Sequence, residues 1–400
     1  MPGYHIDRIT EDIKREIVAI LRELKDPRIS GMLTVVKVSV TNDLSYAKVY
    51  VSAMEGMEAA KASVKGLTAA QGYIRHELGR RLHLRKCPEL RFIADDSIEK
   101  GFALWDKLKE LDPDHKALVN LLGVPPCTDT DHYEIYLRRF VEEFDPEIIS
   151  YDHYNLQFKE VDRLTDKPEA IVSESCRAAN GWQDKVFEKY NRYMFMDNLE
   201  VVRQVAAEKN LPWKIIVQVV EHWNFRYLTE SEIRWGVFNA LAYGPMEIDY
   251  FTYCTPPGRA EGWDYHHALI NLDGTKDSHY YMVQRINKDL ALLGAEIMDA
   301  KSEEVLHIGI EPGDKRVRYF FESYGSISNV DAKALVLGFF DNGKIILSNK
   351  DMEMPQHISF AFEGTPKHLN KVSGQWEDMV KADDGRYHLC LAAGDGEMIK

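Results

Sequence analysis

The sequence lacks paired cysteines, long apolar runs and any overall excess of positive charge. Its five cysteines are scattered singly along 400 residues, so neither a disulfide framework nor a structural zinc site is expected, and all five are predicted to be free thiols. No apolar run reaches the roughly 18–20 residues that cross a bilayer, and the N-terminus turns charged without a secretory apolar segment. These absences favour a cytoplasmic protein without a bound metal or cofactor.

The charge of the chain is distributed unevenly. The formal net charge is −14, yet residues 1–100 hold 17 Lys and Arg against 14 Asp and Glu, a balance of +3, which leaves 33 against 50, or −17, for residues 101–400. All seven tryptophans also follow residue 100. A step in both charge and aromatic content marks a domain boundary, so we expect a basic first part and an acidic second part with different functions.

The first hundred residues predict a small α+β domain. Residues 6–24 place isoleucine and leucine at intervals of three and four, which predicts an amphipathic helix. Residues 33–40 and 45–52 are rich in β-branched and aromatic residues and flank a polar turn, which predicts a hairpin. Two helical stretches on either side of Gly72 and a short strand at 89–94 complete an α-β-β-α-α-β order. We therefore expect helices to cover one face of a three-stranded sheet.

The last helix of this part is the candidate nucleic-acid interface. Arginine is dense on and after it, and the forked donors of arginine suit phosphate oxygens, with binding driven by release of counterions. A glycine just before the helix would let a ligand approach the backbone closely and leave helix N–H groups available to a phosphate. The alternative interpretation is an ordinary solvated helix face. The candidate RNA-binding residues are Ala70, Gln71, Gly72, Arg75, Arg80, Arg81, Arg85 and Lys86.

Four segments within residues 4–101 carry a family resemblance: RITEDIKREIVAILRELKDPRI, GMLTVVKVSVTNDLSYAKVYVS, AAQGYIRHELGRRLHLR and PELRFIADDSIEKG. In order and spacing they resemble the successive motifs of the ribosome-binding factor A family. The resemblance implies a type II KH-like fold in which an Ala-x-Gly kink, here Ala70 to Gly72, replaces the usual GxxG loop. It also implies a non-enzymatic factor that contacts the rRNA of the small ribosomal subunit and assists late maturation of the 30S subunit and rRNA processing.

The rest of the chain predicts βα units followed by a β-sandwich. Short apolar strands alternate with amphipathic helices, as in a parallel sheet. From about Val305 the pattern becomes short strands with turns, and Asp341-Asn342-Gly343 is a strong hairpin signal. We expect three domains, at 1–101, 102–304 and 305–400. The four expected parallel strands lie near 117–122, 147–154, 214–220 and 246–253.

A second resemblance covers this region. The segments LDPDHKALVNLL, PEIISYDHY, IIVQVVEHW, ESEIRWGVFNALAYGPMEIDYFTYCTP and LAAGDGEMI resemble the second half of a retaining (β/α)8 glycoside hydrolase, a half TIM barrel with its C-terminal sandwich. In such enzymes the strand ends carry the chemistry. The resemblance implies Glu221 as the nucleophile, Trp223 and Trp263 as sugar-stacking platforms, and His153 and Tyr154 as residues that line the cleft.

The barrel is predicted to be incomplete. A retaining glycosidase needs two carboxylates about 5–5.5 Å apart, and the acid/base belongs to the half of the barrel that is missing. Glu221 is therefore interpreted as a remnant without activity, and a carbohydrate-active protein is kept as the alternative function. Because four βα units cannot close a sheet, we expect an uncovered apolar face and a homodimer through the half-barrel.

Overall fold

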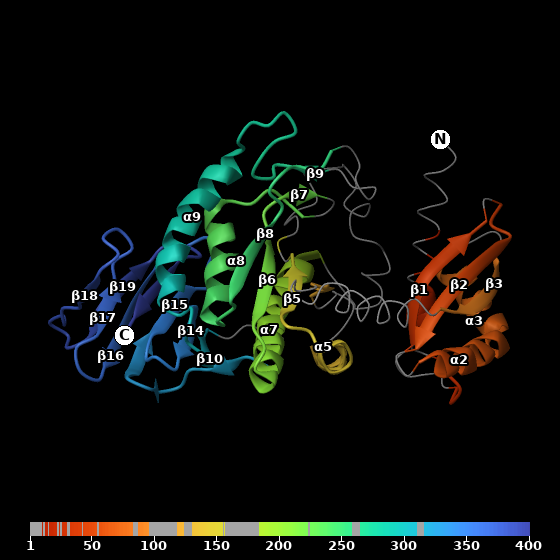
Figure 1. The fold of residues 1–400 in the computed structure, drawn as a ribbon, viewed down its shortest axis with the longest axis horizontal. Helices are drawn as coiled ribbons and strands as arrows, with labels where there is room; N and C mark the ends of the chain where they lie inside the picture. Colours follow the sequence, from red (N-terminus) through yellow and green to blue (C-terminus); the bar gives the residue numbers. More distant parts are fainter. Residues whose placement is uncertain are drawn as a thin grey trace. The chain divides into compact units, whose positions relative to one another are not determined.

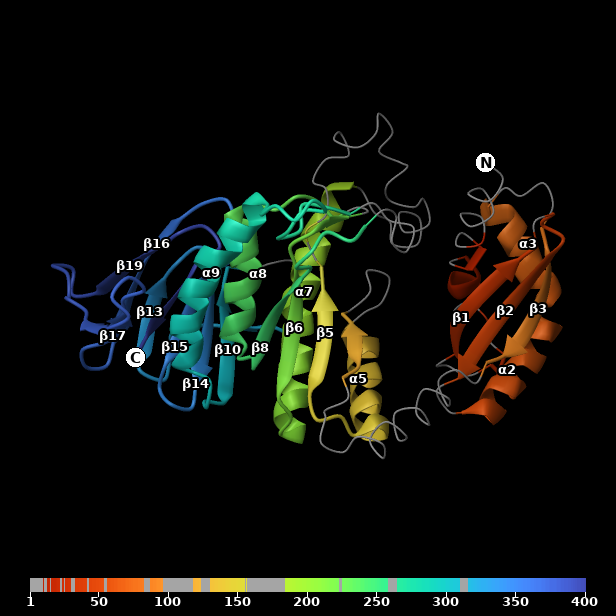
Figure 2. The same cartoon turned by 45° about the horizontal axis from the view of Figure 1, so that its top comes forward.

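The computed structural model forms two compact units, which are described separately (Figures 1 and 2). The first contains the described residues up to Asp95, and the second contains those from Leu118 to the end of the chain. The structure describes residues 10, 13–14, 16–21, 24, 26–29, 33–41, 43–53, 56–82, 87–95, 118–123, 130–154, 156, 184–222, 225–257, 265–309 and 316–400.

The first unit is a three-stranded sheet with its helices on one face. Strand β1 (Leu33–Val40) pairs antiparallel with β2 (Tyr46–Ala53), and β2 pairs in parallel with β3 (Glu89–Ala94). Helices α2 (Met57–Ala69) and α3 (Gln71–Leu82) connect β2 to β3, as can be followed in Figure 2. The positions of these elements and the three-stranded sheet confirm the prediction from the sequence.

Alternating burial along the strands explains this arrangement. Ala47 and Val49 of β2 are fully buried, in one core with the inward side chains of all the helices. The pairing register of β1 and β2 shifts between Val35 and Lys37. Such a bulge adds one residue to a strand, so Val35 and Val38 both reach the core although they are three residues apart.

The second unit begins with a parallel sheet whose strands are neighbours in chain order. Strands β4 (Asn120–Leu122), β5 (Ile149–His153), β6 (Trp213–Gln218) and β8 (Glu247–Phe251) pair side by side, all in parallel. They are the four strands that the sequence predicts. The helices between them are α5 (Thr130–Phe144), α7 (Asp184–Lys209) and α8 (Glu230–Ala242).

One face of this sheet is mainly polar, so the expectation of an uncovered apolar face was wrong. The apolar side chains of the strands pack against the helices, whereas the alternate positions form a hydrogen-bonded polar layer. Ser150 donates to Asn120 (2.8 Å), Asn120 donates to Asp152 (2.8 Å), and Lys214 donates to Asp249 (2.7 Å). A parallel sheet that is covered on both faces would have apolar residues at both sets of positions. The uncovered apolar face is thus absent from the described strands, and the expected homodimer loses its hydrophobic driving force.

A two-sheet sandwich completes the second unit. Its strands are β10 (Ser302–Ile308), β11 (Arg318–Tyr319), β12 (Ser323–Tyr324), β13 (Ile327–Asp331), β14 (Leu335–Phe340), β15 (Ile345–Asn349), β16 (Gln356–Phe362), β17 (Lys367–Leu369), β18 (Trp376–Asp378), β19 (Tyr387–Leu391) and β20 (Gly396–Ile399). One sheet has the order β11-β10-β14-β15-β20-β17-β18 and the other β12-β13-β16-β19, with an apolar core between them. The predicted hairpin joins β14 to β15, and Gly343 supplies the positive φ (76°) of its turn.

Helix α8 is buried between the parallel sheet and the sandwich. All but one of its residues from Glu232 to Ala242 are buried, so it packs on several sides at once. The backbone of β14 comes very close to its end, because a Cβ added at Gly338 would lie 2.0 Å from the carbonyl oxygen of Ala242. Only glycine fits such an approach, and Gly338 therefore fixes the packing of helix on sheet.

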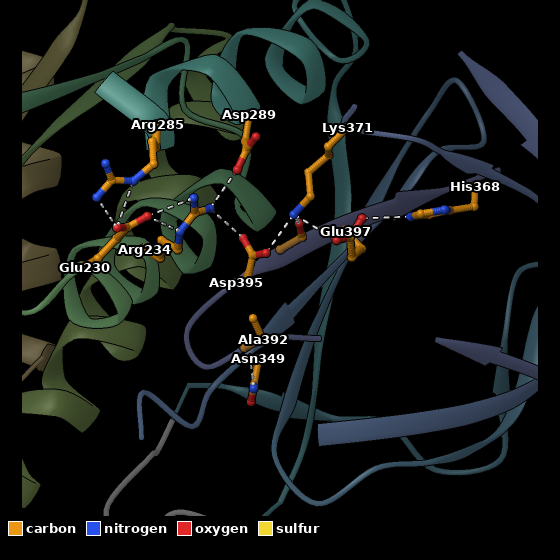
Figure 3. Close-up of polar contacts among 11 residues, drawn as sticks. Glu230, Arg234, Arg285, Asp289, Asn349, His368, Lys371, Ala392, Asp395 and Glu397 are labelled. Carbon is orange, nitrogen blue, oxygen red and sulfur yellow. Dashed lines mark hydrogen bonds and ion pairs between the residues drawn. The ribbon is translucent and has the colours of Figure 1, made fainter. Parts of the chain in front are cut away.

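A chain of ion pairs links α8 and α9 (Ser278–Ala295) to the sandwich (Figure 3). The guanidinium of Arg234 contacts Asp289 at 2.7 Å and Asp395 at 3.0 Å. Lys371 contacts Asp395 at 2.7 Å and Glu397 at 2.8 Å. The Arg234 side chain is only 15% exposed and that of Asp395 only 12%. Each buried charge is thus matched by a partner, as burial requires.

Several expected absences can be compared with the part of the chain that the structure describes. None of its helices is long and apolar enough to cross a membrane. Within the same residues, no group of three or more His, Cys, Asp or Glu could hold a metal ion. Cys87, Cys254 and Cys390 are free thiols, while Cys127 and Cys176 lie outside the described residues.

Candidate nucleic-acid interface

The junction of α2 and α3 is a shallow kink rather than a loop. Helix α2 ends at Ala69, Ala70 follows with φ −85° and ψ 0°, and α3 begins at once with Gln71. Backbone hydrogen bonds continue across the junction, from Ala70 N–H to the Gly66 carbonyl (3.0 Å) and from Ile74 N–H to the Ala70 carbonyl (3.0 Å). The Gln71 amide donates to the Leu90 carbonyl of β3 (2.5 Å). Gln71 therefore anchors the kink to the sheet.

Gly72 lies in ordinary helix, which corrects the expectation of a special backbone geometry. It is the second residue of α3, it is not among the residues with positive φ, and a Cβ added there would meet nothing within 4 Å. Neither the fold nor its packing requires glycine at this position. The remaining role for Gly72 is to let an external ligand approach the exposed surface of the helix.

The arginines of α3 differ in how far they are free to bind phosphate. Arg80 is 64% exposed although it contacts Glu77 at 2.7 Å, and this hydrogen bond holds the pKa of Glu77 below its usual value. Arg75 is exposed and donates to the Cys87 carbonyl (3.1 Å). Arg81 is only 20% exposed and reaches Glu77 (3.4 Å) and Glu16 (3.8 Å). Arg81 is therefore a structural residue that holds α3 to the first helix.

Two further candidates, Arg85 and Lys86, lie outside the described residues. The structure adds others that the sequence reasoning missed. Tyr73 is 48% exposed and His76 is exposed, and both share the exposed face of α3 with Arg80 because residues three and four apart are neighbours on a helix. Aromatic rings between cations are a pattern of nucleic-acid binding, and that interleaving was the available signal. The exposed face of α3 is defined as Tyr73, Arg75, His76 and Arg80.

The described glycosidase-like candidates of the second unit lie at or after the carboxyl ends of parallel strands: His153 ends β5, Tyr154 follows it, and Glu221 lies three residues after β6. His153 faces the helix side, where it is buried with its Nδ1 2.8 Å from the Asn198 oxygen of α7; burial lowers its pKa to about 4. It therefore does not line a cleft. Tyr154 is half-buried and bonds to Asp152, and burial raises the pKa of Asp152 although its hydrogen bonds oppose the shift. Trp223 and Trp263 lie outside the described residues.

An aromatic cluster surrounds His222, the residue after Glu221. Strand β7 (Glu221–His222) pairs with β9 (Tyr265–His266), and the His222 ring stacks on Tyr265 at 5.1 Å. Tyr154 stacks on Phe251 at 5.3 Å. Burial lowers the pKa of His222, which favours its neutral form. His222 and Tyr265 are buried, and Tyr154 bonds to Asp152, so the cluster is mainly internal packing, while Glu221 itself is half-exposed.

Comparison with known proteins separates the two units. The family model for ribosome-binding factor A matches residues 5–108. Ribosome-binding factor A of Acetivibrio thermocellus is 48% identical over 112 residues, which are 28% of this chain and 91% of the relative. A homology model of the Thermus thermophilus ribosome binding factor A, fitted into the cryo-EM map of a 30S complex, is 30% identical and covers 22% of this chain and 93% of its own, with a TM-score of 0.20.

The structural matches over the second unit include distant ones. The crystal structure of a β-galactosidase from the psychrophilic Marinomonas ef1 is 15% identical, covers 51% of this chain and 27% of its own, and has a TM-score of 0.32. Such a score carries no argument for a shared fold or activity. The match to the Acetivibrio relative, at 48% identity over 91% of its length, is of a different order. Through its first unit, the chain belongs to the ribosome-binding factor A family.

Proposed function

We propose that the chain is a ribosome assembly factor that acts in the cytoplasm, where its first unit binds the rRNA of the small ribosomal subunit and assists late maturation of the 30S subunit and rRNA processing. The observation that carries this proposal is the match of the entire first unit to proteins named ribosome-binding factor A. The Thermus relative fitted into a 30S complex supports the small subunit as the partner. The α-β-β-α-α-β order supports the type II KH-like assignment.

The exposed face of α3 is the proposed contact with rRNA. Arg75 and Arg80 present charge to solvent, Tyr73 offers a ring, and Gly72 leaves the helix surface next to them without a side chain. RNA helices are recognised mainly through their backbone and shape, so exposed guanidinium groups beside an accessible backbone suit a phosphate ligand. Arg85 and Lys86 would extend this positive surface along the chain.

The test is a filter-binding titration of the full chain with small-subunit rRNA at several salt concentrations. Arg75→Glu with Arg80→Glu is expected to weaken binding about tenfold or more and to flatten the salt dependence, because two phosphate contacts are lost. Arg81→Glu is unsuitable because Arg81 holds buried carboxylates. Unchanged affinity in a double variant with native thermal melting would contradict the assignment of α3.

We propose that the second unit is a partial, glycosidase-like barrel without glycosidase activity. Its support is the position of Glu221 three residues after the end of the parallel strand β6; the aromatic cluster around His222 is largely buried and does not itself offer a sugar-binding face. A retaining mechanism needs a second carboxyl group with a raised pKa about 5–5.5 Å away, and the acid/base of such enzymes belongs to the half of the barrel that this chain is predicted to lack. We expect no hydrolysis of nitrophenyl glycosides and no effect of Glu221→Gln. Turnover that is abolished by this substitution would establish the carbohydrate-active alternative.

A further inference from the structure

The face of the three-stranded sheet that points away from the helices is a second unusual surface of the first unit. Along β2 the residues Tyr46, Lys48 and Tyr50 alternate with buried Ala47 and Val49. The buried set packs in the core with the helices, so the other set faces the opposite way, as strand geometry requires. The sheet face is defined as Lys37, Ser39, Tyr46, Lys48, Tyr50, Glu89 and Arg91.

The pairing register places three cations in a diagonal strip across all three strands. Lys48 of β2 is directly opposite Arg91 of β3. Lys37 of β1 is opposite Tyr50, two residues along from Lys48, and such diagonal neighbours lie about 7–8 Å apart. The strip therefore offers positive charge at three neighbouring points across the sheet.

This strip of cations destabilises the domain when no ligand is bound. Like charges directly opposite each other on a sheet are destabilising, and Lys48 and Arg91 occupy such a pair. One carboxylate of the sheet face, Glu89, lies 3.6 Å from Arg91. Within the described residues no ion pair involves Lys37 or Lys48. A polyanion laid across the strip would remove the repulsion, and it would release counterions.

The tyrosines give the strip a second kind of contact. Tyr46 remains 41% exposed although the guanidinium of Arg91 lies 4.8 Å from the centre of its ring. Tyr50 is half-buried in the row of Lys37. Rings beside cations on an exposed surface bind unpaired bases by stacking while the cations follow the backbone. Paired bases offer no free faces to such rings.

We infer that the sheet face is a second RNA-binding surface, which takes a single-stranded segment, while the exposed face of α3 takes another part of the rRNA. The inference rests on the proposed function and extends it to the opposite side of the domain. One small domain would then hold two RNA segments at once. The linked contacts would raise overall affinity above that of either surface.

The experiment uses the full chain and a single-stranded oligouridine as the probe, with an RNA duplex of equal length for comparison. Lys37→Glu with Lys48→Glu is expected to weaken oligouridine binding about tenfold or more and to lower the salt slope by about 1.4, from two lost contacts on a single strand. Lys37→Arg with Lys48→Arg keeps the charge and should bind normally. Lys333→Glu with Lys381→Glu, on exposed lysines of the second unit, controls for the change in net charge.

The outcomes separate this inference from the function proposed above. Ultraviolet crosslinking of oligouridine should label a peptide that contains Tyr46 or Tyr50. If the α3 variant loses rRNA binding while Lys37→Glu with Lys48→Glu binds oligouridine normally and melts normally, the sheet-face inference fails and the proposed function stands. If zero-length crosslinks join Lys37 or Lys48 to carboxylates of residues 118–400 and RNA does not displace them, the face binds protein, and the inference is overturned.

Discussion

The two units use their positive charges in opposite ways. In the first, cations stand on the surface, with Arg80 64% and Arg91 59% exposed. In the second, several cations are enclosed by carboxylates, with Arg203 9%, Arg234 15% and Lys371 14% exposed, beside exposed ones such as Arg285. The net charge of −14 conceals this difference. The proposed nucleic-acid contact of the first unit therefore rests on where the charges lie and not on their sum.

The largest expected effect tests whether the enclosed cations hold the second unit together. Arg234→Ala would remove the cation that pairs with Asp289 and one of the two that pair with Asp395, which keeps Lys371, and breaking a buried pair costs about 3–5 kcal/mol. Urea unfolding followed by tryptophan fluorescence reports mainly on this region, because six of the seven tryptophans belong to the second unit. Arg285→Ala is the matched control, since that side chain is 56% exposed and should cost less than about 1 kcal/mol. Equal losses in the two variants would mean that burial does not distinguish them.

A smaller effect concerns how the stability of the second unit depends on pH, through its buried histidines. The pKa of His153 is lowered by burial to about 4, from 6.5, and the pKa of His307 is lowered in the same direction. A depressed histidine pKa means that the unfolded chain binds more protons between these values. The free energy of unfolding therefore keeps its full value above pH 6.5. It decreases as the pH falls toward 4, by about 3 kcal/mol for His153. His153→Gln should flatten the fall in urea stability between pH 7 and 4.5, and an unchanged slope would refute this account.

The smallest effect concerns two glycines of the first unit. Gly72→Ala is expected to stabilise α3 by up to about 1 kcal/mol, because alanine favours helix and the site is open. Gly66→Ala should do the reverse, since its Cβ would lie 2.8 Å from Ile29 Cγ1. Hydrogen exchange of the α2 and α3 amides in the full chain measures both. Slower exchange in the Gly72 variant together with weaker rRNA binding would identify Gly72 as a point of ligand approach.

Local patterns in the sequence predicted most elements, because their causes are local. The hairpin of β1 and β2, the strand Glu89–Ala94 and the turn at Gly343 follow from side-chain type and spacing over a few residues. The polar layer of the parallel sheet was missed because runs such as WKIIVQ (213–218) hide which positions face the helices. A shift of one residue reverses every side chain of a strand, and this parity is set only by packing.

The same limit applies to the candidate site, where local features could be predicted and tertiary contacts could not. The sequence predicted that α3 carries arginines. It could not show which of them pair with carboxylates elsewhere in the fold. Arg81 is held by Glu16, which is 65 positions earlier in the chain, and no local pattern encodes such a contact. Likewise His153 and Tyr154 are adjacent in sequence, yet only His153 turns toward α7. The sheet face needs the pairing of β1, β2 and β3 before Lys37, Lys48 and Arg91 can be recognised as neighbours.

The central claim is that RNA binding belongs to exposed cations of the first unit. The most direct measurement is co-sedimentation of the full chain with precursor 30S subunits, comparing Arg75→Glu with Arg80→Glu against Lys333→Glu with Lys381→Glu. Both variants change the net charge by −4, on the first and the second unit respectively. The account predicts that the first variant stays in the supernatant and that the second pellets with the subunits. Equal loss in both, or retention of the first, would contradict it.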